Sequence, residues 1–340
     1  IICEALLSRH PPPPWDMSQL TVDLFGKYLN SLNASGSSSK IKTARAGVLW
    51  VAQHFGMSIP KDFRPGISHL NKGLNRRNVR KIAQDAGVLK KGKDGLTLEQ
   101  YAMIARALLA EGECFGQLVL VLAWNLMARA SNPLSLALSH LEASGDHFLI
   151  YFAHMKSDQE GNLSRYPRAC YANPLRPEIC IMLAFGLFFV TYPFKPDQTH
   201  LFEGGSQYDR FVKVFQAALK EPELKDLLVH LGASIKDLAA HSPRKGCTRH
   251  CTSGSSGGAS ISAVSIRAGW KQPGVQDTYL RFEAAGDAVV GRCASGLPLG
   301  DEKFAMLPPH FTNEGTRIAS LAINILFPNA PERLHGVLVL

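Results

Sequence analysis

The short stretch Lys90-Lys-Gly-Lys-Asp-Gly95 constrains the fold most, because it separates two regions of unlike composition. Residues 1–95 contain 15 Lys and Arg against 6 Asp and Glu, whereas residues 96–340 contain 22 of each, so the net charge of +9 belongs to the first region. A chain of 340 residues can form two domains with separate cores. We predict an extended leader at 1–14, a basic domain at 15–95, a second domain at 96–295 and a C-terminal tail of unassigned function at 296–340.

The basic region has the periodicity of a small helical domain. Its first predicted helix begins near Ser18, with an apolar face formed by Leu20, Leu24, Tyr28 and Leu32 and flanked by Phe25 and Leu29. Two further helices are predicted, one from about Lys40 and one around residues 72–81. Clustered cations neutralise phosphates without reading base sequence, so we predict a polyanion-binding region; the alternative is a basic domain that is merely soluble. The candidate contacts are Lys40, Lys42, Arg45, Lys72, Arg76, Arg77, Arg80, Lys81, Lys90, Lys91 and Lys93.

The second region begins with two predicted helices. Thr97 and Gln100 have the spacing of a capping box at the start of the first. The second is apolar, runs from about Phe115 to Ala128, and leads into Arg129-Ala-Ser-Asn-Pro133. Proline disfavours helical geometry in the residue before it, so we expect Arg129 at a helix end beside a turn. The alternative role for this arginine is a surface residue that interacts with the helix dipole.

A predicted β-hairpin follows. Residues 147–154 and 165–171 are rich in strand formers and flank the turn Lys156–Gly161, which places Lys156 at the mouth of the hairpin. A lysine there can equally be a solubilising edge residue. Three more helices are expected at about 177–190, 206–219 and 222–231. The predicted fold class is therefore mainly α with a small β-sheet or hairpin.

The stretch from His241 to Tyr279 contains residue types that phosphoryl transfer requires. His241 and Arg244 are three residues apart, Trp270 follows Gly269, and Tyr279 comes nine residues after Trp270. Phosphoryl transfer needs donors around the phosphate, a nucleophile in line with it and an acid for the leaving oxygen. The alternative is a helical segment with an ordinary core Trp and Tyr. A second arginine and a proton donor would have to come from elsewhere in the chain.

This set and spacing resemble the tyrosine recombinase, or phage-integrase-like, family. In that family a His-x-x-Arg box precedes a Gly-[His or Trp] pair, and the nucleophilic Tyr follows nine residues later. The strings His241-Ser-Pro-Arg-Lys-Gly246 and Ile266-Arg-Ala-Gly-Trp-Lys271 look most like the DIRS and Crypton recombinases of eukaryotic mobile elements. Arg129 and Lys156 match the family's first arginine and its hairpin lysine, whereas Asn132 stands where the family often has an acidic residue. The resemblance covers roughly residues 15 to 295.

The resemblance implies cutting and rejoining of double-stranded DNA through a 3′-phosphotyrosine, without a metal or other cofactor. Residues 15–95 would be the core-binding domain that clamps DNA, and residues 96–295 the catalytic domain. Tyr279 would attack the phosphorus, Arg129 and Arg244 would hold its non-bridging oxygens, and Lys156 would protonate the leaving 5′-oxygen. His241 and Trp270 would assist. The expected function is site-specific recombination or integration of a mobile element, by a homo-oligomer assembled on DNA.

Three other functions are compatible with the residues. One is relaxation of DNA in the manner of type IB topoisomerases, which use a similar set. Another is a domesticated DNA-binding protein without catalysis, an interpretation that Asn132 favours slightly. The third is a structural zinc site formed by His241, Cys247, His250 and Cys251, although no Cys-x-x-Cys pair accompanies them.

The cysteines and the hydrophobic runs indicate a compartment. The chain has 7 cysteines without framework spacing, which is typical of reduced thiols in an intracellular protein. We recognise no signal peptide, and the longest apolar run, at 179–192, is too short to span a bilayer. We therefore expect no membrane association, and the resemblance implies a nuclear location. Because the first residue is not Met, the chain is compatible with a fragment of a longer protein.

Overall fold

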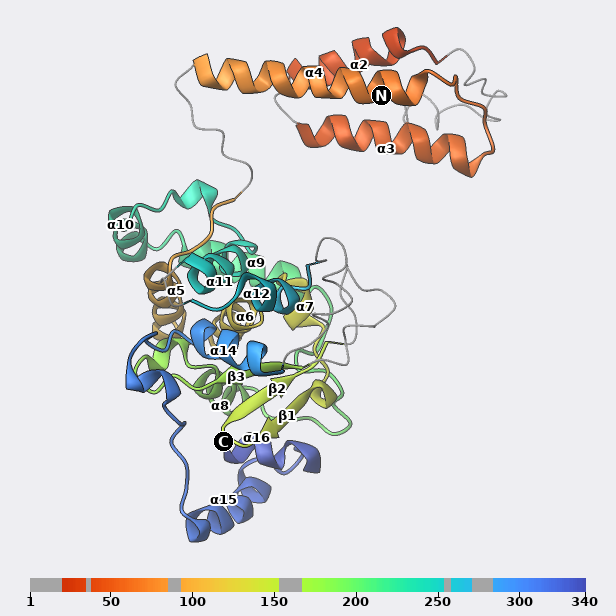
Figure 1. Ribbon diagram of the computed structural model, residues 1–340. Coiled ribbons are helices and arrows are strands. Elements are labelled where there is room, and N and C mark those ends of the chain that lie inside the picture. The colour runs from red at the N-terminus through yellow and green to blue at the C-terminus, as the bar shows by residue number, and fades with distance from the viewer. Residues whose placement is uncertain (1–19, 35–37, 85–92, 153–166, 254–257, 271–283) are drawn as a thin grey trace. The chain divides into compact units, whose positions relative to one another are not determined.

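The computed structural model is mainly helical, with one small antiparallel sheet, which confirms the predicted fold class (Figure 1). It describes residues 20–34, 38–84, 93–152, 167–253, 258–270 and 284–340. The leader at 1–14 lies outside the described residues. The chain divides into two compact units, Ile1–Lys91 and Gly92–Leu340, and each unit is described here by itself.

Unit 1 contains the helices α2 (Val22–Ala34), α3 (Ser38–His54) and α4 (Phe63–Gln84). Phe25 and Leu29 of α2 are fully buried against Phe63 and Ile67 of α4. The predicted face of the first helix is confirmed in part, because its members other than Leu24 pack against this core, whereas Leu24 is 59% exposed. Phe25 and Leu29, which were expected only to flank the face, are the most deeply buried, because the partner helix determines where the centre of the buried face lies.

Unit 2 is built around α6 (Cys114–Asn125), whose residues from Phe115 to Asn125 are all buried. The helix is apolar on every side because α5 (Leu98–Ala110), α8 (Ile181–Thr191), α9 (Gln207–Ala218) and α11 (Ser242–Ser253) all pack against it. The predicted capping box at the start of α5 is confirmed. The Gln100 backbone N–H donates to the Thr97 hydroxyl over 3.2 Å, and the Thr97 N–H donates to the Gln100 side chain over 3.0 Å.

The sheet consists of β1 (Leu141–Ser144), β2 (His147–Ile150) and β3 (Arg168–Tyr171), in the order β1-β2-β3. Strands β2 and β3 pair antiparallel, with His147 opposite Tyr171 and Ile150 opposite Arg168. They are the two strands of the predicted hairpin. The residues between them for which we predicted a turn, with Lys156, lie outside the described residues.

One local prediction failed at the end of α6. Asn132 and Pro133 lie inside a one-turn helix, α7 (Ser131–Leu134). The proline is tolerated because the first N–H groups of a helix have no intrahelical partner to lose. Arg129 therefore precedes the start of α7 and does not end α6.

Five further α-helices belong to the described part of unit 2. They are α10 (Pro222–His230), α12 (Ile261–Arg267), α14 (Ala284–Ala294), α15 (Asn313–Leu326) and α16 (His335–Val339). The segment after residue 296 belongs to the same compact unit. Leu334 and Val337 are buried in the main core, and α16 packs against β1. No helix in the described ranges is long and apolar enough to cross a membrane.

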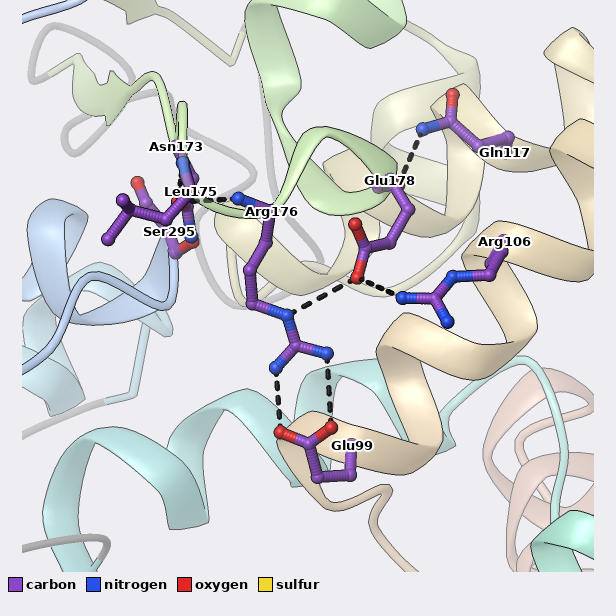
Figure 2. Close-up of polar contacts among 8 residues, drawn as sticks. All are labelled: Glu99, Arg106, Gln117, Asn173, Leu175, Arg176, Glu178 and Ser295. Atoms are coloured by element: carbon purple, nitrogen blue, oxygen red, sulfur yellow. Dashed lines mark hydrogen bonds and ion pairs between the residues drawn. The ribbon is translucent and has the colours of Figure 1, made fainter.

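A polar network joins the start of α5 to the turn before α8 (Figure 2). Arg176 donates to both carboxylate oxygens of Glu99, over 2.7 and 3.1 Å, and to Glu178 over 3.3 Å. Arg106 donates to the same Glu178 oxygen over 3.1 Å. Glu178 is buried, so two arginines compensate the cost of taking its charge out of water.

Candidate active site

His241 and Arg244 lie at the N-terminal end of α11. His241 precedes the first residue of the helix, Pro243 is in its first turn, and Ser242 accepts a hydrogen bond from the Ala239 N–H over 2.9 Å. A proline in the first turn is already shaped for a helix and removes an N–H that would lack a partner. The local sequence therefore starts a helix at this point and leaves His241 exposed at its positive end.

Arg129 comes from a different part of the chain, the turn after α6. The Met127 N–H donates to the Trp124 carbonyl and the Ala128 N–H to the Ala123 carbonyl, which is the Schellman pattern of helix termination. Met127 takes the left-handed position, with φ 47°, that glycine usually occupies. Because Met127 is fully buried, packing holds it in this unfavourable conformation. The turn directs the chain from the core to Arg129, which is partly exposed.

The structure brings Arg129 close enough to His241 and Arg244 for its positive charge to lower the pKa of both. Burial, and then the positive charge of Arg129, lower the pKa of Arg244 to about 10. The pKa of His241 lies below its usual value because of partial burial and then the positive charges of Arg129, Arg244 and Lys245. In the described part of the chain no carboxylate pairs with Arg129 or Arg244. Two guanidinium groups and a neutral imidazole thus form a site that favours an anion.

The Gly269–Trp270 pair lies at the C-terminal end of α12 and is tied to the same site. Gly269 has φ 68°, the Trp270 N–H donates to the Ser265 carbonyl over 2.9 Å, and the helix ends in a second Schellman turn. The glycine is needed for this left-handed position, and the turn leaves Trp270 46% exposed. Arg244 donates to the Ala268 carbonyl over 2.7 Å, so one guanidinium joins the two sequence boxes. Figure 1 shows α11 and α12 near one another over α6 and α14.

A segment at the start of unit 2 is held against α11. The Leu96 N–H donates to the Ser242 carbonyl over 3.2 Å, and Lys245 donates to the Lys93 carbonyl. A Cβ on Gly246 would lie 2.2 Å from the Leu96 carbonyl oxygen and 2.7 Å from the Trp124 ring. Gly246 of the His241–Gly246 string is therefore required for close packing between this segment, α6 and α11.

The other predicted residues are distributed as follows. Lys156 and Tyr279 lie outside the described residues, as do Lys90, Lys91 and the side chain of Lys81. Lys93 is exposed and donates to the Lys236 carbonyl. Among the unit 1 candidates Arg45 is partly exposed, and the exposed ones are Lys40, Lys42, Lys72, Arg76, Arg77 and Arg80.

Three charged residues near the site were missed by the sequence analysis. Arg168 of β3 donates to the Arg267 carbonyl over 3.2 Å, and Arg267 is paired with Asp287 over 2.7 Å. Both arginines are buried. The sequence offers a signal for Arg267 alone, which lies three residues before Trp270. An arginine in a helix is ordinarily a surface residue, and its burial cannot be inferred without knowing what packs around it.

The zinc hypothesis gains no support from the geometry. Cys247 and Cys251 are buried with their sulfurs 4.0 Å apart, while His241 lies at the exposed end of α11. Within the described ranges no group of three or more His, Cys, Asp or Glu side chains could hold a metal ion. The six cysteines that the structure describes are free thiols.

The arrangement can bind an anion between guanidinium groups and place a neutral imidazole and an indole N–H beside it. His241 can accept a proton because its lowered pKa keeps the ring uncharged near neutral pH. No protein-family model matches the chain, and no curated protein matches it.

Proposed function

We propose that this chain is a tyrosine-recombinase-type enzyme that cuts and rejoins double-stranded DNA through a covalent 3′-phosphotyrosine. The observation that carries the proposal is the cluster of Arg129, His241 and Arg244, in which the two arginines have no described carboxylate partner. Like charges repel, so bringing two guanidinium groups together costs free energy that a bound phosphate would recover. The sequence resemblance assigns the same three residues to a scissile phosphate.

In the proposed reaction, Tyr279 attacks the phosphorus and forms a new P–O bond while the bond to the 5′-oxygen breaks. His241 accepts the tyrosine proton, and Lys156 gives a proton to the departing 5′-oxygen. Arg129 and Arg244 bind the two non-bridging oxygens, where charge accumulates in the transition state. Rejoining is the reverse of these steps, with a DNA 5′-hydroxyl as nucleophile.

Arg244 has donors for both of its roles. A guanidinium carries five N–H groups, and only one described hydrogen bond, to the Ala268 carbonyl, occupies them. The same side chain can therefore hold the Gly269–Trp270 turn and still offer N–H groups to a phosphate. Because Arg244 can bind a phosphate while it holds the turn that carries Trp270, the Trp270 indole N–H can donate to the same phosphate.

The basic surface of unit 1 supports DNA as the substrate. Its exposed cations lie on α3 and α4, away from the buried residues that hold these helices together. Such a surface binds phosphates with strong dependence on salt and little on sequence. We extend the proposal to the nucleus as the site of action, to a mobile element as the source, and to a homo-oligomer assembled on DNA.

The proposal is tested with nicked suicide DNA substrates, which trap the covalent intermediate because the cleaved fragment diffuses away. We expect an SDS-resistant protein–DNA band from the unmodified chain and none from Tyr279→Phe. Tyr208→Phe is the matched control, because Tyr208 is an exposed tyrosine of α9, and it should keep the band. DNA binding should be unchanged in both variants.

Two results would contradict the proposal. An SDS-resistant band from Tyr279→Phe would show that Tyr279 is not the nucleophile. No band from any substrate would show that the chain does not cleave DNA. DNA affinity alone would then remain, as in a non-catalytic binding protein.

A further inference from the structure

Arg267 is a charged side chain with no exposed surface. Its Nη1 donates to Asp287 Oδ1 over 2.7 Å. Its Nε and Nη2 donate to the Asn125 carbonyl over 3.0 and 2.9 Å, and Nη2 also donates to the Ala169 carbonyl over 2.9 Å. The second oxygen of Asp287 accepts the Ala169 N–H over 2.8 Å. One ion pair therefore joins α6, β3, α12 and α14.

The acceptors of Arg267 belong to segments that lead to the candidate site. Asn125 is the last residue of α6, and its carbonyl immediately precedes the turn that presents Arg129. Arg267 itself is the last residue of α12, and the turn that follows holds Ala268, the partner of Arg244, and Trp270. The Arg267 guanidinium therefore connects the Asn125 carbonyl, before Arg129, to the end of α12, which precedes the Ala268 carbonyl that accepts a hydrogen bond from Arg244.

Core packing alone does not explain a charge at this position. A buried ion pair is often no more stabilising than apolar residues of similar volume, so a methionine would serve a purely structural role at lower cost. An apolar side chain could not hold two carbonyl groups and a carboxylate in one plane, as the guanidinium fork does. This directional bonding fixes the relative position of two turns.

We propose that Arg267 and Asp287 form a positioning pair that sets the distance between Arg129 and Arg244. This positioning role rests on the proposed function, because the distance between Arg129 and Arg244 determines whether both guanidinium groups reach one phosphate. Neither residue contacts the DNA. A misplacement of about 1 Å is enough to slow a reaction by roughly 100-fold when alignment of bound groups supplies the rate.

The test is the double variant Arg267→Met/Asp287→Asn, which removes both charges of the ion pair. The matched control is Arg292→Met/Asp146→Asn. It breaks a different partly buried ion pair of α14, with a distance of 2.7 Å between Arg292 Nη2 and Asp146 Oδ2. Single-turnover cleavage of the suicide substrate yields a rate constant and an amplitude, and DNA affinity is measured separately.

We expect the Arg267/Asp287 variant to cleave about 10 to 100 times more slowly, with full amplitude and unchanged DNA affinity. The control should cleave at the normal rate. A lower amplitude with a normal rate constant would show a loss of folded protein only, and would overturn the positioning role. A normal rate and amplitude in the Arg267/Asp287 variant, or an equal slowing in the control, would overturn it too.

A second measurement separates this inference from the proposed function. The pKa of His241, followed by NMR, is lowered by partial burial and then by the positive charges of Arg129, Arg244 and Lys245, so it responds to the distances of the two arginines from His241. If the unmodified chain cleaves no DNA, the proposed function fails, but a rise of this pKa in the Arg267/Asp287 variant and not in the control still supports the positioning pair. An unchanged pKa in the variant would refute it.

Discussion

Replacing Gly246 by alanine adds one methyl group to α11 where the backbone of a neighbouring segment leaves no space. The added Cβ would lie 2.2 Å from the Leu96 carbonyl oxygen, 2.8 Å from the Leu96 nitrogen and 2.7 Å from the Trp124 ring. Trp124 cannot move aside, because it is fully buried, stacks on Tyr101 at 4.2 Å and donates to the Ala294 carbonyl over 2.9 Å. The Leu96 segment must therefore shift away from α11.

The expected change in the free energy of unfolding has three contributions. Forcing an extra methyl group into a filled core costs about 1–3 kcal/mol. Loss of the hydrogen bond from the Leu96 N–H to the Ser242 carbonyl costs about 1 kcal/mol. Alanine recovers about 1 kcal/mol over glycine through its helix propensity. We expect a net loss of about 2 kcal/mol in the free energy of unfolding, which lowers the Tm of unit 2 by about 4–8 °C.

Thermal unfolding followed by circular dichroism or calorimetry measures this change. Gly186→Ala is the matched control, since Gly186 lies on the exposed side of α8 and its added Cβ would meet nothing within 4 Å. The control should be as stable as the unmodified chain or slightly more so. If Gly246→Ala matched the control, Gly246 would not be needed for close packing of Leu96 on α11.

The remaining predictions concern charge and proton transfer. Replacing four exposed cations of α4 by Gln should make the log–log salt slope of DNA binding shallower by about 3 to 4. Replacing the exposed Lys213 of α9 and Lys225 of α10 by Gln should leave the slope unchanged, and an unchanged slope in the α4 variant would remove unit 1 from the DNA surface. His241 should titrate below its unfolded pKa of about 6.5, and Arg129→Gln should raise its pKa; an NMR titration at or above 6.5 would contradict the cation cluster. Because the folded pKa is the lower one, the stabilisation from neutral His241 should be present above about pH 6.5 and decrease as the pH falls towards the folded pKa. Lys156→Ala should slow cleavage without weakening DNA binding, and a 5′-phosphorothiolate substrate, whose sulfur leaves without a proton, should restore the rate; a variant that stays slow would show that Lys156 is not the acid. The cations replaced in α4 are Lys72, Arg76, Arg77 and Arg80.

Local signals in the sequence predicted the structure correctly where the interacting groups are a few residues apart. The capping box at Thr97 and Gln100 is such a case, since both of its hydrogen bonds form within the first turn of α5. The apolar stretch that became α6 was also recognisable, because a helix that is hydrophobic on every side must be buried.

Local reasoning failed where two conformations or faces were nearly equivalent. Leu24 and Phe25 both belong to helical apolar stripes of α2, and contact with Phe63 and Ile67 buries Phe25 alone. The tendency of Asn132 to avoid helical geometry before Pro133 was overcome in the first turn of α7. In both cases the preference is weak, on the order of 1 kcal/mol or less, and tertiary packing exceeds it.

The amino-acid sequence was sufficient to predict the charge asymmetry, the order of most of the helices, the hairpin strands and the boxes that contain His241, Arg244 and Trp270. These depend on composition and on short-range periodicity. The tertiary structure was needed to show that Arg129 lies near Arg244 and that neither has a carboxylate partner among the described residues. It was also needed to show that Arg267 is buried and paired with the partly buried Asp287. Burial and charge–charge interactions depend on distances between residues far apart in the chain, which no local pattern specifies.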